Sequence, residues 1–175
     1  MSKIIKVVFV KGDSLFSKVI EKVEQLGEDL HGNNNVDFVP SHCGLIVDDQ
    51  FREALIDGFV GENVRRYDPT NIRIYDVTIN DDAAIAAGDT KFNKLLGQKY
   101  SISALVCGAT YTIFSMIIGN TPNQDDCSGD DTEILRAYGL DINNKDADGN
   151  DVPASSITPN ILIGIIAKIG TLEGA

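Results

Sequence analysis

Basic residues are scarce in this chain of 175 residues, which has 15 Lys and Arg against 26 Asp and Glu. The net charge of −11 argues against a duplex nucleic acid partner, because phosphate binding requires clustered Lys and Arg. It also argues against simple adsorption to an anionic lipid surface. Hydrophobic residues make up 43% of the chain and charged residues 23%, as in ordinary globular proteins, and the length predicts a single domain over residues 1–175.

Cysteine is also rare, and its spacing gives no sign of a disulfide framework. The three cysteines are an odd number without paired spacing, which fits a reducing compartment or one reactive thiol among structural ones. The first residues, Met1–Lys6, lack the long apolar run and the small-residue cleavage site of a signal peptide. These features predict a cytoplasmic or otherwise non-Sec-exported protein, and they leave its oligomeric state open.

Charged side chains are absent from residues 100–124, a stretch long enough to consider as a membrane span. Several Ser, Thr and Gly residues lower its hydrophobicity, and no basic cluster flanks it. We therefore expect a buried helix from Ser101 to Ile118 and no integral membrane span.

The stretch from Pro40 to Gly58 has the pattern of a β-hairpin. Its two arms, Cys43–Val47 and Phe51–Ile56, are apolar and rich in β-forming residues, and a polar turn separates them. The turn residues, Asp48-Asp49, would form the loop if it is two residues long. The length of this loop sets the register of the two arms and hence which side chains share a face.

The register decides whether His42 can interact with Glu53. A two-residue loop pairs Gly44 with Glu53 and makes His42 a diagonal neighbour on the same face, with Cβ atoms roughly 7 Å apart. A three-residue loop would place the two side chains on opposite faces. On one face, the carboxylate would orient the imidazole as a base, which is half of a nucleophilic site. Cys43 alternates onto the other face, where a packed thiol is expected.

A candidate nucleophile, Cys127, lies far downstream at the start of a predicted helix. Apolar residues recur with helical spacing up to Tyr138, and Gly139 is a typical C-terminal stop. Ser128 and Asp131 match an N-terminal capping box. A thiol at this position would face unpaired backbone N–H groups, which favour the thiolate.

These motifs, in this order, resemble those of the permuted papain-like amidases and peptidases of the NlpC type, the YiiX/YebB-like group. The similar segments, which run across nearly the whole chain, are Gly12-Asp13-Ser14, Ser41–Val47 with Glu53-Ala54, Gly97-Gln98-Lys99-Tyr100, and Cys127-Ser128.

The resemblance implies an α+β, circularly permuted papain-like fold with a central antiparallel sheet packed against helices. It implies a cysteine hydrolase with a triad of Cys127, His42 and Glu53 that cleaves an amide or acyl bond through a thioester acyl-enzyme. Tyr100 and Ser128 would bind substrate or support the site. The expected substrates are peptides, peptidoglycan-derived peptides or lipid-linked acyl groups, and no cofactor is needed.

An alternative is a catalytically inactive binding module on the same fold. The acidic residues that flank the cysteine would raise the pKa of its thiol and oppose the helix dipole. They are Asp125, Asp126, Asp130 and Asp131. Two arginines in the segment Val64–Tyr67 would either bind an acidic substrate group or form a solvated surface. The segment Asn144–Gly149 partly matches a calcium loop but lacks a glutamate at its twelfth position, so we expect a surface loop without metal.

The remaining periodic segments predict further strands and helices. Strands are expected at Ile4–Val10 and Ile72–Val77, helices at Leu15–Leu26 and Asp81–Leu96, and a short strand or helix at Ile161–Ile169. The other histidine, His31, lies in a polar loop and is expected to be solvated.

Overall fold

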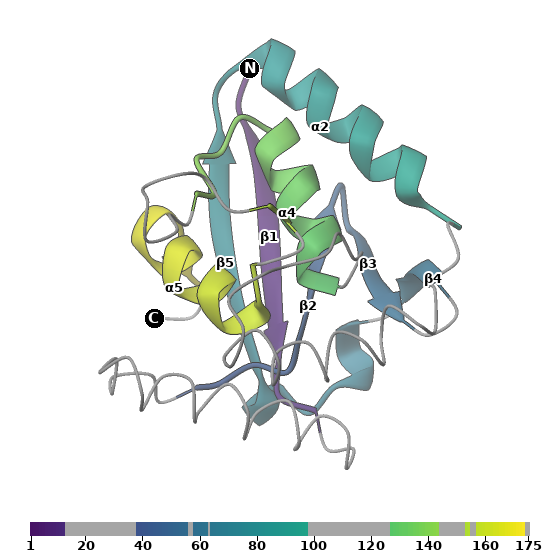
Figure 1. Cartoon of the computed structure of the whole chain (residues 1–175), viewed down its shortest axis with the longest axis vertical. Helices are drawn as coiled ribbons and strands as arrows, with labels where there is room; N and C mark the ends of the chain where they lie inside the picture. The colour runs from purple at the N-terminus through teal and green to yellow at the C-terminus, as the bar shows by residue number, and fades with distance from the viewer. Residues whose placement is uncertain are drawn as a thin grey trace.

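The computed structural model describes residues 1–12, 38–55, 58–62, 64–97, 127–143, 153–154 and 157–173. Within them the chain forms an α+β structure with one antiparallel sheet (Figure 1). Several predictions fall outside the described residues: the helix at Leu15–Leu26, His31, Tyr100, the helix at Ser101–Ile118 and the loop at Asn144–Gly149. Among the described residues, no helix has the length and apolar character needed to cross a membrane.

The sheet has six strands in the order β4-β3-β2-β1-β5-β6, and every neighbouring pair is antiparallel. The strands are β1 (Lys3–Val10), β2 (His42–Val47), β3 (Gln50–Leu55), β4 (Gly58–Glu62), β5 (Ile72–Ile79) and β6 (Thr171–Leu172). The described helices are α2 (Asp82–Leu95), α4 (Cys127–Ala137) and α5 (Pro159–Ile169), with short 3₁₀ turns η1 (Val64–Arg66) and η2 (Pro69–Asn71).

Most of the predicted elements are present. The segments Ile4–Val10 and Ile72–Val77, predicted as strands, form β1 and β5, and the segment Asp81–Leu96 forms α2 with Asp81 as its N-cap. The last apolar segment, left open as a strand or a helix, is helix α5 because Thr158 caps it and Pro159 occupies its first turn. Strand β4 was not predicted, because its two glycines weaken the strand pattern.

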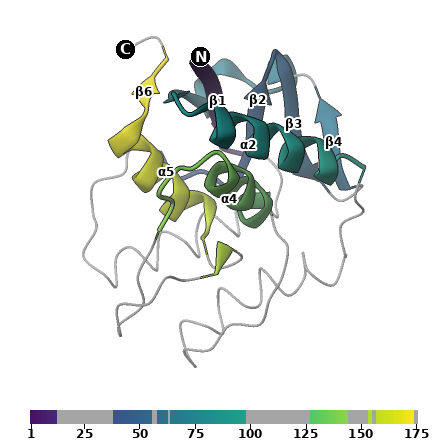
Figure 2. The same cartoon turned by 90° about the horizontal axis from the view of Figure 1, so that it is seen from above.

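The two faces of the sheet have different partners. One face packs against the helices, where Val7, Phe9 and Leu45 join Ile134 of α4 and Leu162 of α5 in the main core. Figure 2 shows these helices as a layer beside the sheet. The opposite face carries a smaller cluster around three buried residues, with half-buried neighbours packed on it. The cluster consists of Val8, Val10 and Phe51, with Ile46, Val64, Tyr67, Ile72 and Ile74.

Helix α4 ends as the sequence predicted. Gly139 adopts a left-handed conformation with φ of 78°, its N–H donates to the Arg136 carbonyl, and the Leu140 N–H donates to the Leu135 carbonyl. This pair of hydrogen bonds is a Schellman motif, which satisfies carbonyls left open at the helix end. The predicted capping box is wrong in detail, because the helix already includes Cys127 and Ser128 therefore lies inside its first turn.

Helices α2 and α4 meet through a glycine. A Cβ atom added to Gly88 would lie 2.1 Å from the Tyr138 ring, so only the absence of a side chain allows this approach. The Tyr138 hydroxyl donates to Asp89 Oδ1 at 2.5 Å, and Lys3 Nζ lies 2.6 Å from the same oxygen. These contacts place the C-terminal end of α4 beside the start of β1.

Candidate active site

The hairpin turn has two residues, which is the register that brings His42 and Glu53 to one face. Asp48 and Asp49 both adopt left-handed backbone conformations, with φ of 49° and 61°. Two successive positive φ values at a two-residue loop are the signature of a type I′ turn. Gly44 accordingly lies opposite Glu53, as predicted for the shorter loop.

The His42 imidazole contacts the Glu53 carboxylate directly. His42 Nε2 lies 2.7 Å from Glu53 Oε2, with 17% of the histidine side chain exposed and none of the glutamate. A carboxylate only accepts hydrogen bonds, so Nε2 carries the proton and donates it. In the neutral ring the lone pair then lies on Nδ1, which is the nitrogen able to act as a base. The predicted orientation of an imidazole by a carboxylate is therefore present.

Two residues from outside the hairpin also hold Glu53. The Tyr67 hydroxyl donates to Oε2 at 2.5 Å, and Arg66 Nη2 forms an ion pair with Oε1 at 2.7 Å. Arg66 also donates to the Tyr67 hydroxyl at 2.7 Å, and its guanidinium lies 4.8 Å from the centre of the tyrosine ring. Burial, together with the hydrogen bond to Glu53, raises the pKa of Tyr67, so its hydroxyl remains a donor.

No sequence pattern indicates that Arg66 pairs with Glu53. Either a substrate contact or a solvated surface was expected for the arginines, and Arg66 instead contacts a fully buried carboxylate. The two residues are separated by strand β4, whose position in the sheet was not predicted. The contact could have been predicted only if a sequence pattern for β4 had shown that the chain turns back and places η1 beside the hairpin.

Gly44 lies between His42 and the turn, at a position where no side chain fits. An added Cβ would lie 2.7 Å from the Arg52 carbonyl oxygen, 2.8 Å from the Phe51 ring and 3.0 Å from Glu53 Cβ. Such distances are shorter than van der Waals contact and would require the two strands to separate. The glycine therefore allows the close strand pairing that holds Glu53 within reach of the imidazole.

The backbone of Cys127 starts helix α4, as predicted. The other end of α4 lies beside the start of α2, where Gly139 approaches Ala84, and α2 starts beside Met1. An 11-residue helix is roughly 16 Å long. Cys127 therefore lies toward the opposite end of the sheet, where β1 ends and His42 begins β2 (Figure 1).

The structure brings His42 and Glu53 together. It describes the backbone of Cys127 but not its side chain, and Tyr100 lies outside the described residues. The helix α4 packs on the face that carries Cys43, and the imidazole points to the other face by strand alternation. A contact between the imidazole and the thiol would therefore form around the end of β2. Cys43 is fully buried, as expected for a packing residue.

Polar residues line the buried side of the first two turns of α4. Ser128, Asp131 and Thr132 have no exposed surface. The amino-terminal end of a helix favours negative charge, which would stabilise either a thiolate or this buried carboxylate. Ser128, predicted as a supporting residue, is thus a buried residue in the first turn of the helix that begins at Cys127.

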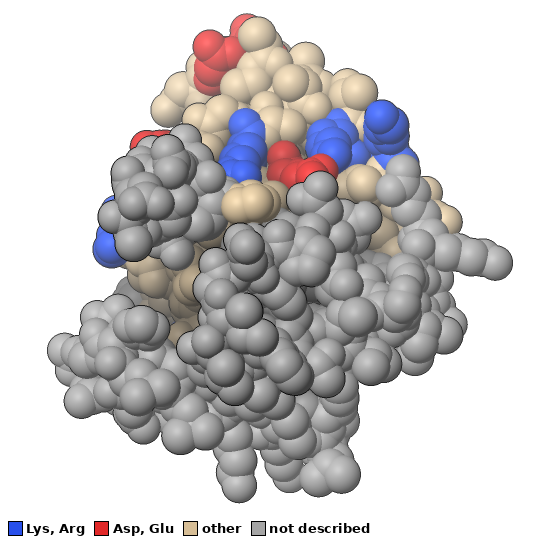
Figure 3. Space-filling model, viewed as in Figure 1, with Lys and Arg blue, Asp and Glu red and all other residues tan. Residues whose placement is uncertain are grey.

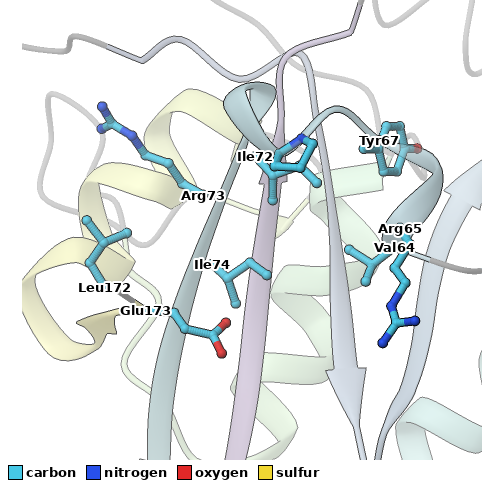
Figure 4. A pocket seen from close by; sticks show the side chains of 9 residues that line it. Val64, Arg65, Tyr67, Ile72, Arg73, Ile74, Leu172 and Glu173 are labelled. Carbon is cyan, nitrogen blue, oxygen red and sulfur yellow. The ribbon is translucent and has the colours of Figure 1, made fainter. Parts of the chain in front are cut away.

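A hollow of about 440 Å³ adjoins the same network on the face opposite the helices. The Tyr67 ring forms one wall, while the hydroxyl of the same residue reaches Glu53. Figure 4 shows the apolar side chains of Ile72 and Ile74 on its floor. The other lining residues are Val64, Arg65, Pro69, Arg73, Leu172 and Glu173.

The described surface on the helix side shows no large area of one charge. Figure 3 shows basic and acidic side chains next to one another there. Lys91 and Glu133, for example, form an ion pair between α2 and α4. Among the described residues, no group of three or more His, Cys, Asp and Glu side chains could hold a metal ion.

A scan against protein-family models gives no match for this chain, and a search of curated proteins also gives none.

Proposed function

We propose that this protein is a cysteine hydrolase with a circularly permuted papain-like fold. Cys127 is the nucleophile, His42 the base and Glu53 the residue that orients the base. The observation that carries the proposal is the 2.7 Å contact between His42 Nε2 and the buried Glu53 carboxylate, at the end of the sheet toward which α4 begins. The antiparallel sheet with a cysteine-bearing helix on one face is compatible with such a fold.

In the proposed reaction, His42 Nδ1 accepts the proton of the Cys127 thiol as sulfur attacks the substrate carbonyl carbon. The carbonyl electron pair moves to oxygen, and its return expels the amine or alcohol, which takes the proton from His42. The product is a thioester acyl-enzyme. Water, deprotonated by His42, then attacks the thioester, and Cys127 leaves as the thiol together with a carboxylic acid product.

Two parts of the described structure suit this chemistry. Glu53 and its partners fix the ring so that the proton stays on Nε2, which leaves Nδ1 basic. Backbone N–H groups at the start of α4, the helix that begins at Cys127, would stabilise the oxyanion. The proposed substrates are peptides, peptidoglycan-derived peptides and lipid-linked acyl groups, in which the bond cleaved is an amide or an ester.

A second candidate is a catalytically inactive binding module on the same fold. Its supporting observation is Asp131, a fully buried carboxylate in the first turns of the helix that begins at Cys127. A nearby negative charge raises the pKa of a thiol and so reduces the thiolate that attacks a carbonyl. The two candidates differ in the reactivity of Cys127, and a labelling experiment distinguishes them.

The experiment measures alkylation of the full chain by a limiting amount of iodoacetamide near pH 7, with mass spectrometry of the peptides. Cys127 should react first, because a helix start and a neighbouring imidazole both favour the thiolate. Cys43 should react slowly, because it has no exposed surface. His42→Ala should slow the labelling of Cys127, whereas Arg73→Ala is a control that should leave it unchanged.

Hydrolysis of peptide amides and acyl esters is then assayed for the wild type and for Cys127→Ala. Loss of all turnover in this variant, with unchanged thermal unfolding, is the expected result. Cys43→Ala is the matched control for loss of a thiol and should retain turnover if it folds. Equal labelling of all three cysteines, or labelling that is indifferent to His42, would favour the binding module.

A further inference from the structure

Arg66 forms an ion pair with Glu53, the carboxylate that also contacts the proposed base, His42. Without Arg66, only a protonated His42, in the part of the chain that the structure describes, would balance the charge of Glu53. Glu53 has no exposed surface, and a buried carboxylate without a compensating positive charge is strongly disfavoured. Among the described residues, two groups can supply positive charge to it: the guanidinium of Arg66 at 2.7 Å from Oε1 and, when protonated, the imidazole of His42 at 2.7 Å from Oε2. Arg66 is charged throughout the working pH range, so the imidazole need not be.

We infer that Arg66 is a positioning residue that keeps His42 neutral, and therefore basic, near pH 7 by balancing the charge of Glu53. The inference rests on the proposed function for its meaning in catalysis, because it concerns the base of that reaction. A histidine that faces an uncompensated buried carboxylate would hold a proton to higher pH and could not accept one from a thiol.

Tyr67 and Arg66, the described residues that contact Glu53 from η1 and its end, have separate parts in this arrangement. Tyr67 donates a hydrogen bond to the same oxygen as His42 and carries no charge, because its pKa is raised by burial and by Glu53. Arg66 supplies the charge, and its hydrogen bond to the Tyr67 hydroxyl fixes the direction from which the tyrosine donates. Substitutions at the two positions therefore separate charge from hydrogen bonding.

The test is an NMR titration of the histidine C2 protons in the full chain, which reads proton binding and not turnover. The chain has two histidines, so a His31→Gln background leaves the signal of His42 alone. Arg66→Gln should raise the apparent pKa of the His42–Glu53 pair by about one unit or more, because the pair keeps one proton when its positive partner is lost.

Three variants complete the test. Arg66→Lys retains the charge and should titrate near the wild type. Arg65→Gln removes the neighbouring charge, which lines the hollow, and should leave the titration unchanged. Glu53→Gln should lower the pKa of His42, because the imidazolium then loses its carboxylate while the positive charge of Arg66 remains nearby.

A rise for Arg66→Gln together with a fall for Glu53→Gln supports the inference. No shift, or a shift of opposite sign, in either variant overturns it, and so does an equal rise for Arg65→Gln. If Arg66→Gln does not fold, the other two variants decide: the pKa of His42 should fall in Glu53→Gln and stay near the wild type in Arg66→Lys, and any other result overturns the inference. The two proposals can fail separately. If the titrations give the expected shifts but Cys127 is unreactive in the alkylation experiment, the proposed hydrolase function is wrong and the inferred role of Arg66 is still supported.

Discussion

At the scale of single residues, Glu53 connects the hairpin to the segment that follows β4. Its carboxylate is reached by His42 from β2, by Tyr67 that follows η1, and by Arg66 within η1. A buried carboxylate with an ion pair on one oxygen and two hydrogen bonds on the other has one stable orientation, and it passes that orientation on to the imidazole. The orientation of the proposed base therefore depends on Tyr67 and Arg66 as well as on Glu53.

This arrangement leads to a prediction about combined substitutions. His42→Ala should reduce hydrolysis by about 10²-fold or more, the range expected for loss of a positioned base. Combining it with Cys127→Ala should be scarcely worse than Cys127→Ala alone, because residues that act as one unit are not additive. Glu53→Gln should be milder, since it disturbs the orientation of the base and not the base itself. The measurement is kcat/KM for each variant on one substrate.

The control for this series is Glu133→Gln, which removes an exposed carboxylate of α4 that pairs with Lys91. It should leave kcat/KM unchanged. Multiplicative losses for the double variant would contradict a shared mechanism and would indicate that His42 and Cys127 contribute independently.

At the scale of elements, the position of α4 depends on its contact with α2. Gly88 lies in the interior of α2, where glycine is normally unfavourable by about 1 kcal/mol relative to alanine. Here it is retained because the Tyr138 ring occupies the space that a methyl group would fill. The packing of two helices thus overrides the local preference of one of them.

Gly88→Ala should therefore destabilise the fold by about 1–3 kcal/mol, the usual cost of overpacking. Gly164→Ala is the matched control, since Gly164 lies inside α5 and, apart from the backbone of its own helix, no atom of the described residues lies within 4 Å of an added Cβ. That substitution should stabilise the protein by up to about 1 kcal/mol. Urea unfolding of the three proteins gives both values. Equal changes in the free energy of unfolding for the two alanine variants would show that the close contact between Gly88 and Tyr138 does not destabilise Gly88→Ala.

Some of these elements could be predicted from the sequence alone and others could not. Periodicity predicted β1, β5 and α2, and the composition of the turn predicted the hairpin that places His42 beside Glu53. These features depend on local preferences and on one short-range pairing. The sequence did not predict the contact of Arg66 with Glu53, because it requires the position of β4, a strand with a weak local pattern.

At the scale of the whole molecule, the few basic residues connect elements that are distant in the chain. Lys3 of β1 contacts Asp48 in the hairpin turn and Asp89 in α2, at 2.8 and 2.6 Å. Lys6 contacts Asp76 of β5 and Glu173 beyond β6, at 3.1 and 2.9 Å. In a chain with a net charge of −11, these pairs reduce repulsion among carboxylates where elements meet.

The whole molecule should consequently lose stability in acid, in part through Asp89. Burial raises the pKa of this carboxyl, but hydrogen bonds from Lys3 and Tyr138 outweigh burial and hold the pKa below its ordinary value of 3.8. A group whose pKa is lower in the folded state stabilises the fold above its unfolded pKa. That contribution disappears as the pH falls through the folded value, which lies below 3.8.

Asp89→Asn tests this contribution by urea unfolding at several pH values. The variant should be less stable than the wild type at pH 7 by about 1 kcal/mol or less, because the side chain is partly exposed and water weakens the ion pair. The difference should narrow below the ordinary carboxyl pKa of 3.8, where the wild-type carboxylate also becomes protonated. Asp49→Asn, at an exposed turn position whose left-handed conformation asparagine also adopts, should stay within about 0.5 kcal/mol of the wild type. A difference at Asp89 that stays constant down to pH 3 would show that the lost stability comes from packing or hydrogen bonding and not from the carboxylate charge.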